Sequence, residues 1–422
     1  MGIDTGAFLI RGARQLLTLH GTPGPRRGPH LKELGIIHDG AVLVRDGIVH
    51  QVGTTRRVEN LAEARDAVAI SAAGRVVMPG LIDGHTHLAC PPPGSGDDLE
   101  MAARRIRTSS AKWLIARLRT QLEAMVRCGT TTVEMKTCGW LDETVDIKLL
   151  RVMAGLRSNP VDIVSSFLFC PPADAAALDA CGAETAARGA EQFLLKIAKR
   201  RLAAFVCIGL KGGESGRLIA QRLLRAASDA GLAARIDLDA DHPADAVALA
   251  NEYRAISIDH TERVRPENAA ILAGFPGIAT FLPAGGFYSP EAAGNLRDLA
   301  DAGAAIALAS NFHPRRQPTL NMQTVIALAC LQGQLTPEEA ISAATVNAAH
   351  ALGCAERVGS LEVGKTADLL ILNAGDYRDA CRQIGANLVH LTMKRGAFIY
   401  KEGEVARLSA DDLLAGREGI RP

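Results

Sequence analysis

The strongest constraint on the fold of this chain is an alternation that repeats eight times along its middle. Short apolar runs alternate there with alanine-rich stretches of helical period. Continuous apolar runs are typical of parallel strands that are covered on both faces. Strand–helix units in such a succession predict a closed (β/α)8 TIM barrel. The eight predicted strands lie near Val77, Thr131, Val161, Ala203, Leu232, Ala255, Gly277 and Ala304.

Both ends of the chain carry short β-type runs instead. The segment Gly40–Gly53 holds two runs joined at Asp46-Gly47, a strong hairpin signal, and residues 367–373 and 396–405 are similar runs near the other end. A length of 422 residues exceeds one ordinary core. We therefore predict a composite β-sandwich domain from residues 1–78 and 358–422, and a barrel domain from residues 79–357.

One helix start is well marked. Thr336 is a good N-cap, Pro337 suits the first helical position, and Glu339 completes a capping box. We predict a helix from this point to Gly353, which suits the residue after the helix end.

Composition argues against two classes of partner. The 47 basic and 46 acidic residues leave a net charge of +1, without the basic excess that binds a nucleic-acid backbone. No stretch approaches the roughly 20 apolar residues of a membrane span, and the N-terminus lacks the pattern of a signal peptide. The nine cysteines are scattered without a CxxC pair, as in proteins of a reducing compartment. We expect a cytoplasmic protein that acts on a small molecule.

His85 and His87 follow the apolar run that opens the predicted barrel. Residues two apart on a strand face the same side, so both imidazoles point into the barrel mouth, where active sites of this fold lie. Imidazole is a good ligand for zinc or iron. The alternative is two solvent-facing histidines in a loop; the context favours metal ligands.

Further candidates lie at other strand ends. His260 ends the sixth predicted strand, where it is a ligand, a substrate contact or a structural histidine. Glu134 and Lys136 lie two apart at the end of the second strand, as substrate contacts or as a structural ion pair. Arg315 follows the eighth strand and suits a substrate carboxylate, or is a surface arginine. Asp239 is a possible catalytic base.

The chain resembles the amidohydrolase superfamily, and within it most of all the imidazolonepropionases. The resemblance covers nearly the whole chain and implies a barrel of the metal-dependent hydrolase type with a β-domain, often as a homodimer. It also implies one divalent metal ion that activates a water molecule for attack on a cyclic amide-like C–N bond. The segments that carry it are PGLIDGHTHL, GTTTVEMKT, DHTE, FLPAGGFYS, IALASNFHP, LTPEEAISAATVNAAHALG and GSLEVGKTADLLIL.

Transferred residue by residue, the resemblance implies an altered site. His85 and His87 match the first two metal ligands of the family, and His260 matches its strand-six histidine. Asp237, 23 residues before His260, replaces a metal-binding histidine, and Asn311 replaces the catalytic aspartate. The predicted ligands are therefore His85, His87 and Asp237. Asn311 cannot accept a proton as an aspartate does, so Asp237 or Asp239 would have to.

Lys211 lies where the family has a substrate-binding glutamate on strand four. Three roles are open: a carbamylated metal ligand, a contact to an acidic substrate group, or an ion pair with Asp237 in place of a metal. An exposed lysine at a strand end is the plain alternative.

The sequence favours a metal-dependent hydrolase that cleaves a C–N bond of a small cyclic amide or amidine. Two alternatives stay open. One is a non-catalytic descendant that binds a ligand or partner, and the other is a lyase or cyclase that uses the metal ion as a Lewis acid.

Overall fold

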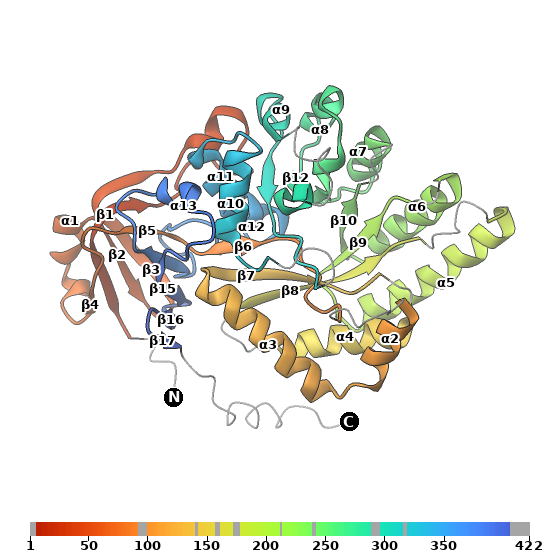
Figure 1. The fold of residues 1–422 in the computed structure, drawn as a ribbon, viewed down its shortest axis with the longest axis horizontal. Helices are drawn as coiled ribbons and strands as arrows, with labels where there is room; N and C mark the ends of the chain where they lie inside the picture. The colour runs from red at the N-terminus through yellow and green to blue at the C-terminus, as the bar shows by residue number, and fades with distance from the viewer. Residues whose placement is uncertain are drawn as a thin grey trace.

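A computed structural model describes residues 6–91, 99–139, 142–156, 161–171, 178–211, 213–238, 242–287, 296–314 and 319–405. The strands form two separate sheets. One contains eight strands from the middle of the chain, and the other contains nine strands from both ends. Figure 1 shows the second sheet beside the first, with its red and blue strands, from opposite ends of the chain, next to one another. None of the described helices is long and apolar enough to cross a membrane.

The eight-stranded sheet is a parallel barrel, which confirms the predicted fold. Its neighbours follow chain order, and every ladder between them is parallel. The first and last strands meet through a parallel bridge between Thr86 and Phe312, and the amide of His87 donates to the carbonyl of Phe312 at 2.7 Å. The strands are β6 (Leu81–Asp83), β7 (Thr130–Lys136), β8 (Asp162–Phe169), β9 (Phe205–Gly209), β10 (Ala233–Asp237), β11 (Ser257–Asp259), β12 (Ile278–Phe281) and β13 (Ile306–Leu308).

Helices follow the barrel strands and cover the barrel. Several begin at a side chain that accepts from the first turn, such as Ser110, Asp142 and Asp179, which satisfies amides that lack a helical partner. They are α2 (Leu99–Thr108), α3 (Ala111–Arg127), α4 (Glu143–Gly155), α5 (Ala180–Lys199), α6 (Gly213–Asp229), α7 (Pro243–Glu252), α8 (Ala269–Ala273), α9 (Leu296–Asp301), α10 (Met322–Leu331), α11 (Pro337–Ala344) and α12 (Val346–Ala351), with 3-10 turns η4 (Thr261–Arg263), η5 (Pro266–Asn268) and η6 (Pro283–Phe287).

The helix predicted from Thr336 to Gly353 is interrupted. The capping box of Thr336 and Glu339 is present, and Gly353 follows the helix end with a φ of +60°. Thr345, however, has φ −128° and ψ −89°, which lie outside the helical region and divide the segment into α11 and α12. The carbonyl of Ile341 accepts from the hydroxyl of Thr345 at 2.6 Å, so this side chain takes part in the break.

The nine-stranded sheet joins the two ends of the chain. Asp46 and Gly47, with φ values of +51° and +78°, form the predicted hairpin turn between β2 and β3. Strand β5 pairs with β14 from the other end of the chain. The strands are β1 (Phe8–Leu17), β2 (Ile36–Arg45), β3 (Ile48–Thr54), β4 (Val68–Ser71), β5 (Val76–Pro79), β14 (Leu369–Leu372), β15 (Val389–Lys394), β16 (Ala397–Lys401) and β17 (Glu404–Val405). The same parts of the chain form α1 (Thr55–Glu59) beside β2 and β3, η2 (Ala62–Ala64), η1 (Gly28–Lys32), which contacts α11, and α13 (Asp379–Arg382), which contacts α10.

The first predicted barrel strand is divided at Gly80. Residues before it belong to β5 in the nine-stranded sheet, and residues after it belong to β6 in the barrel. A Cβ atom at Gly80 would lie 2.3 Å from Oγ1 of Thr131, so only glycine fits where the chain passes between the two sheets. The continuous apolar run could not reveal this division, because both strands are buried.

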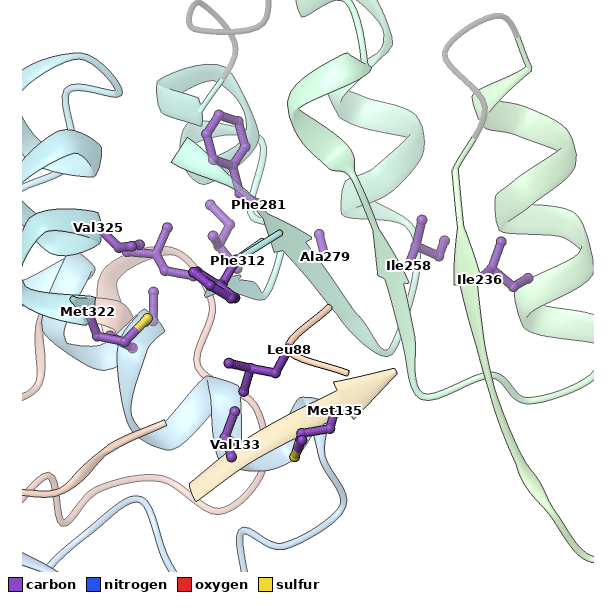
Figure 2. Packing of buried hydrophobic residues seen from close by; sticks show 14 of the residues in the cluster. Leu88, Val133, Met135, Ile236, Ile258, Ala279, Phe281, Phe312, Met322 and Val325 are labelled. Atoms are coloured by element: carbon purple, nitrogen blue, oxygen red, sulfur yellow. The ribbon is translucent and has the colours of Figure 1, made fainter. Parts of the chain in front are cut away.

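Apolar and polar residues alternate along the barrel strands. Val133 and Met135 on β7, Ile236 on β10 and Ile258 on β11 belong to the main hydrophobic core, and Figure 2 shows their side chains. Residues next to them in the sequence face the opposite side of the sheet, which is the barrel interior. These interior residues are charged or polar, so the middle of the barrel is ionic where bulky aliphatic layers are usual.

Candidate active site

His85 lies directly beyond β6 and is completely buried. Its Nδ1 atom is 2.8 Å from Oδ2 of Asp259, whereas its Nε2 atom is buried without a hydrogen-bond partner among the described residues. Burial, helped by the Lys136 ammonium, holds the pKa of His85 well below its usual value. The ring is therefore neutral, and its free nitrogen is in the form that binds a metal ion.

Asp237 and His260 lie around His85. The three residues offer ligand atoms that are all within 4.8 Å of one another. His260 directly follows β11 with a left-handed backbone, φ +65°, and its ring centroid is 4.9 Å from that of His85. Nδ1 of His260 is 2.9 Å from Oε1 of Glu262. Each histidine thus has one nitrogen held by a carboxylate, the usual support of metal-binding histidines.

The donor set fits a divalent metal ion. A buried nitrogen without a partner, a second imidazole and a carboxylate form a set of the kind that holds zinc or ferrous iron. The surrounding charges agree. The carboxylates of Glu134, Asp237 and Asp259 outnumber the two cations that face them, Lys136 and Arg235.

Lys136 is the main cation of this cluster and is completely buried at the end of β7. Its Nζ atom lies 3.1 Å from Oδ1 of Asp237, 3.1 Å from Oδ2 of Asp259 and 3.8 Å from Oε2 of Glu134. Burial disfavours the ammonium, but the anionic neighbours outweigh it and raise the pKa of Lys136 well above its usual value. Lys136 likewise outweighs the burial of Asp237 and lowers the pKa of that carboxyl.

Arg235 completes the ionic interior from β10. Its guanidinium is fully buried and lies 2.6 Å from Oε1 of Glu134 and 2.9 Å from Asp259, and its Nε atom donates to Ser257 at 2.7 Å. These contacts link β7, β10 and β11 across the barrel. The hydroxyl of Ser166 on β8 also donates to Glu134, at 2.5 Å. Glu134 and Lys136 are therefore held by the protein itself, which favours the ion-pair alternative for both.

His87 lies outside the group formed by His85, Asp237 and His260. Its ring centroid is 5.3 Å from that of His85 and 5.3 Å from that of His313. Burial opposes ionisation of Cys90, but hydrogen bonding with Cys138, His313 and His87 outweighs it and holds the pKa of the Cys90 thiol well below its usual value. The structure thus brings His260 to the predicted pair His85 and Asp237, and places His87 beside Cys90.

The remaining predicted site residues either lie away from the group of His85, Asp237 and His260 or fall outside the residues that the structure describes. Asn311 follows β13, is half-buried and has a left-handed backbone, φ +51°. Lys211 is exposed beyond β9 and lines a cavity of about 320 Å³ with Arg217 and His242. Asp237 is paired with Lys136, so the predicted ion pair of Asp237 with Lys211 is replaced by one with Lys136. Arg315 and Asp239 lie outside the described residues.

Sequence reasoning missed Arg235, Asp259 and Glu262 as members of the site. A signal was present for the first two. Arg235 and Asp237, like Ser257 and Asp259, are polar residues two apart in apolar strands, and such pairs share one face. A charged residue repeated at this spacing in a buried strand requires a partner inside the barrel. No comparable pattern marks Glu262, because it lies in a 3-10 turn.

Asp146, on α4 beside the barrel mouth, gives a prediction on pH and stability. It is 1 % exposed, and burial raises its pKa to about 7. The folded state therefore binds a proton more tightly than the unfolded state, so Asp146 lowers stability progressively as pH rises from about 4 to about 7. Asparagine does not ionise, so the Asp146→Asn variant does not lose stability in this way as pH rises. We expect the variant to gain stability on the order of 3 kcal/mol over wild type at pH 8, and little at pH 4.5.

Urea denaturation at both pH values measures this difference. Asp229→Asn, at an exposed position on α6, is the control and should change stability equally at both. A gain that is the same at pH 4.5 and pH 8 in Asp146→Asn would contradict the prediction.

Comparison with known proteins agrees with this architecture. Residues 241–399 match the model of the Amidohydrolase family. The imidazolonepropionase of Brevibacillus brevis is 32% identical over 434 residues, covering 94% of this chain and 99% of the relative. That of Geobacillus kaustophilus is 34% identical over 426 residues, with the same coverage.

Solved structures show the same fold. E. coli guanine deaminase has a TM-score of 0.68 at 18% identity and covers 94% of this chain and 100% of its own. A triazine hydrolase variant has a TM-score of 0.71 at 16% identity, with 97% and 98% covered. Identity at this level establishes the fold alone, whereas the relatives above 30% identity match along nearly the whole chain. The chain therefore belongs to the amidohydrolase family, among relatives that are named imidazolonepropionase.

Proposed function

We propose that this protein hydrolyses a C–N bond of a small cyclic amide or amidine, with one divalent metal ion held by His85, Asp237 and His260. The observation that carries the proposal is the buried, unpartnered Nε2 atom of His85 together with ligand atoms of Asp237 and His260 within 4.8 Å. Membership of the amidohydrolase family and relatives named imidazolonepropionase support the reaction class.

The residues of this chain divide the remaining work. A bound zinc or ferrous ion would supply Lewis acidity toward the scissile group and toward a water molecule. Asp237 remains ionised beside Lys136 and can orient the attacking water through a carboxylate oxygen. Its lowered pKa makes it a weak proton acceptor. Asn311 can donate or accept a hydrogen bond to the substrate but cannot take up a proton.

The cavity beside the barrel mouth suggests a substrate with an acidic group. Lys211, Arg217 and His242 contribute basic side chains to it, alongside Glu214 and Asp245. Arg217 lies 3.9 Å from Asp245, so we assign the contact with a substrate carboxylate to Lys211. We further propose zinc or iron as the metal, a homodimer as the assembly and the cytoplasm as the location.

Asn311 favours a second candidate. Without an aspartate at this position, a lyase or cyclase reaction that needs no proton acceptor there also suits the site. A protein that binds a ligand without turnover is the remaining alternative. Reaction products distinguish the three, because only hydrolysis adds the mass of water to the substrate.

The test incubates purified protein, with its metal content measured, with imidazolones, hydantoins and lactams that carry a carboxylate. We expect about one zinc or iron ion per chain and a product 18 Da heavier than at least one substrate. A product lighter than the substrate favours the lyase, and a ring-closed product of unchanged or lower mass favours the cyclase. Metal-free protein that binds but converts nothing contradicts the proposal. If the double variant Asp237→His with Asn311→Asp then gains ring-opening activity, the residues at these two positions account for the lack of hydrolysis in the wild-type protein.

A further inference from the structure

Two cysteines meet at the barrel mouth, outside the proposed metal-binding group of His85, Asp237 and His260. Cys90 lies in the segment after β6, five residues beyond His85, and Cys138 follows the end of β7, two residues beyond Lys136. Their Sγ atoms are 2.7 Å apart. Both are free thiols in the structure. Cysteines of neighbouring strand ends thus lie in direct contact although 48 residues separate them in the chain.

The surrounding structure holds this contact in place. Arg117 on α3 donates to the carbonyl of Cys90 at 2.7 Å and to that of Ala89 at 2.8 Å, which fixes the backbone on one side. On the other side, Gly139 has a φ of +73°, and a Cβ atom there would lie 3.2 Å from Sγ of Cys170. The turn after Cys138 therefore depends on glycine. Cys90 is 1 % exposed and Cys138 is half-buried.

We propose that Cys90 and Cys138 are a reversible dithiol–disulfide pair that links the ends of β6 and β7 under oxidising conditions. An S–S bond is about 2.05 Å long, so a small approach of the sulfur atoms suffices. The proposal is independent of the reaction catalysed at the metal-binding group.

A peroxide is the oxidant class that fits this pair. The sulfur of one cysteine attacks the peroxide O–O bond, forms a sulfenic acid and releases one molecule of water or alcohol. The sulfur of the other cysteine then attacks the sulfenic sulfur, forms the disulfide and releases water. Two thiols are oxidised by two electrons and the peroxide is reduced by two. A small dithiol reverses the reaction by thiol–disulfide exchange.

The bond would join the two sides of the candidate site. The segment that ends at Cys90 carries His85 and His87, and the strand that precedes Cys138 carries Lys136. The rings of His87 and His313 lie within hydrogen-bonding reach of Cys90. Oxidation would thus fix the spacing between the first histidine of the metal-binding group and the buried ammonium opposite it.

Peptide mapping tests the proposal on the full protein. Reduced protein is treated with hydrogen peroxide, blocked with iodoacetamide and digested with trypsin without reductant. Fragments 76–104 and 137–148 each contain a single cysteine. We expect a joined product of these fragments, 2 Da lighter than the sum of the two free fragments and absent after treatment with dithiothreitol.

Variants separate the pair from general oxidation. Cys138→Ser should abolish the joined product and accumulate a dimedone adduct, the mark of a sulfenic acid, at Cys90. Cys354→Ser, a buried cysteine elsewhere, should retain the joined product. The proposal is overturned if wild-type protein yields both fragments fully alkylated while the exposed Cys181 is oxidised in the same sample. This result needs no variant and is unaffected by loss of folding or of catalytic activity.

Discussion

Lys136→Met should lower the free energy of unfolding by about 3–5 kcal/mol, because it removes one partner from a buried ionic cluster. The ammonium lies 3.1 Å from both Asp237 and Asp259, and all three side chains are almost completely withdrawn from water. Without it, Arg235 alone faces three carboxylates. Methionine has a similar length, so the loss reflects uncompensated charge more than a cavity. Urea denaturation at pH 7 measures the change.

Two comparisons isolate this electrostatic cause. Lys196→Met makes the same substitution on α5, where an exposed lysine lies 2.9 Å from Glu143, and we expect a change within about 0.5 kcal/mol. Adding Asp237→Asn to Lys136→Met removes one of the stranded carboxylates and should restore part of the lost stability. The control is Asp237→Asn in the wild-type protein. If Asp237→Asn lowers the free energy of unfolding by the same amount in wild type and in Lys136→Met, the two residues are not coupled.

His85→Ala should abolish metal binding and reduce turnover by at least about 10³-fold, equivalent to roughly 4 kcal/mol of transition-state stabilisation. His85 supplies the buried nitrogen without a partner, and its other nitrogen is fixed by Asp259. Elemental analysis by mass spectrometry measures the metal, and the cyclic amide assay described above measures turnover. Because the metal readout needs no substrate, the prediction can be checked before the substrate is known.

Substitutions at other positions should affect metal binding less than His85→Ala does. Asp259→Asn keeps the ligands but weakens the hold on His85, so metal affinity should fall by about 10–100-fold. His38→Ala, on β2 in the nine-stranded sheet, is the matched control and should leave metal content and turnover unchanged. Full metal content in a folded His85→Ala protein would exclude the proposed ligand group.

Asp237 brings a carboxylate to the end of β10, where it is almost completely buried. This carboxylate does not lie in an apolar site, since Lys136 and His260 lie beside it. The Lys136 ammonium outweighs the burial and holds the pKa of Asp237 below its usual value.

Much of the architecture was determined by the sequence alone. Apolar runs, helical periods and turn signals act locally, so the eight barrel strands, the hairpin at Asp46-Gly47 and the capping box at Thr336 were predictable from short segments. The division at Gly80 was not, because it depends on the contact with Thr131, 51 positions away.

The membership of the site was decided only by the tertiary structure. Sequence placed His85, His87 and Asp237 at strand ends, but which of them share one centre depends on how the barrel closes and on side-chain partners. Those partners come from distant strands: Asp259 holds His85, Lys136 holds Asp237, and Cys90 lies beside His87. Strand periodicity fixes the face on which a residue lies, whereas a pairing across the barrel needs the position of every strand at once.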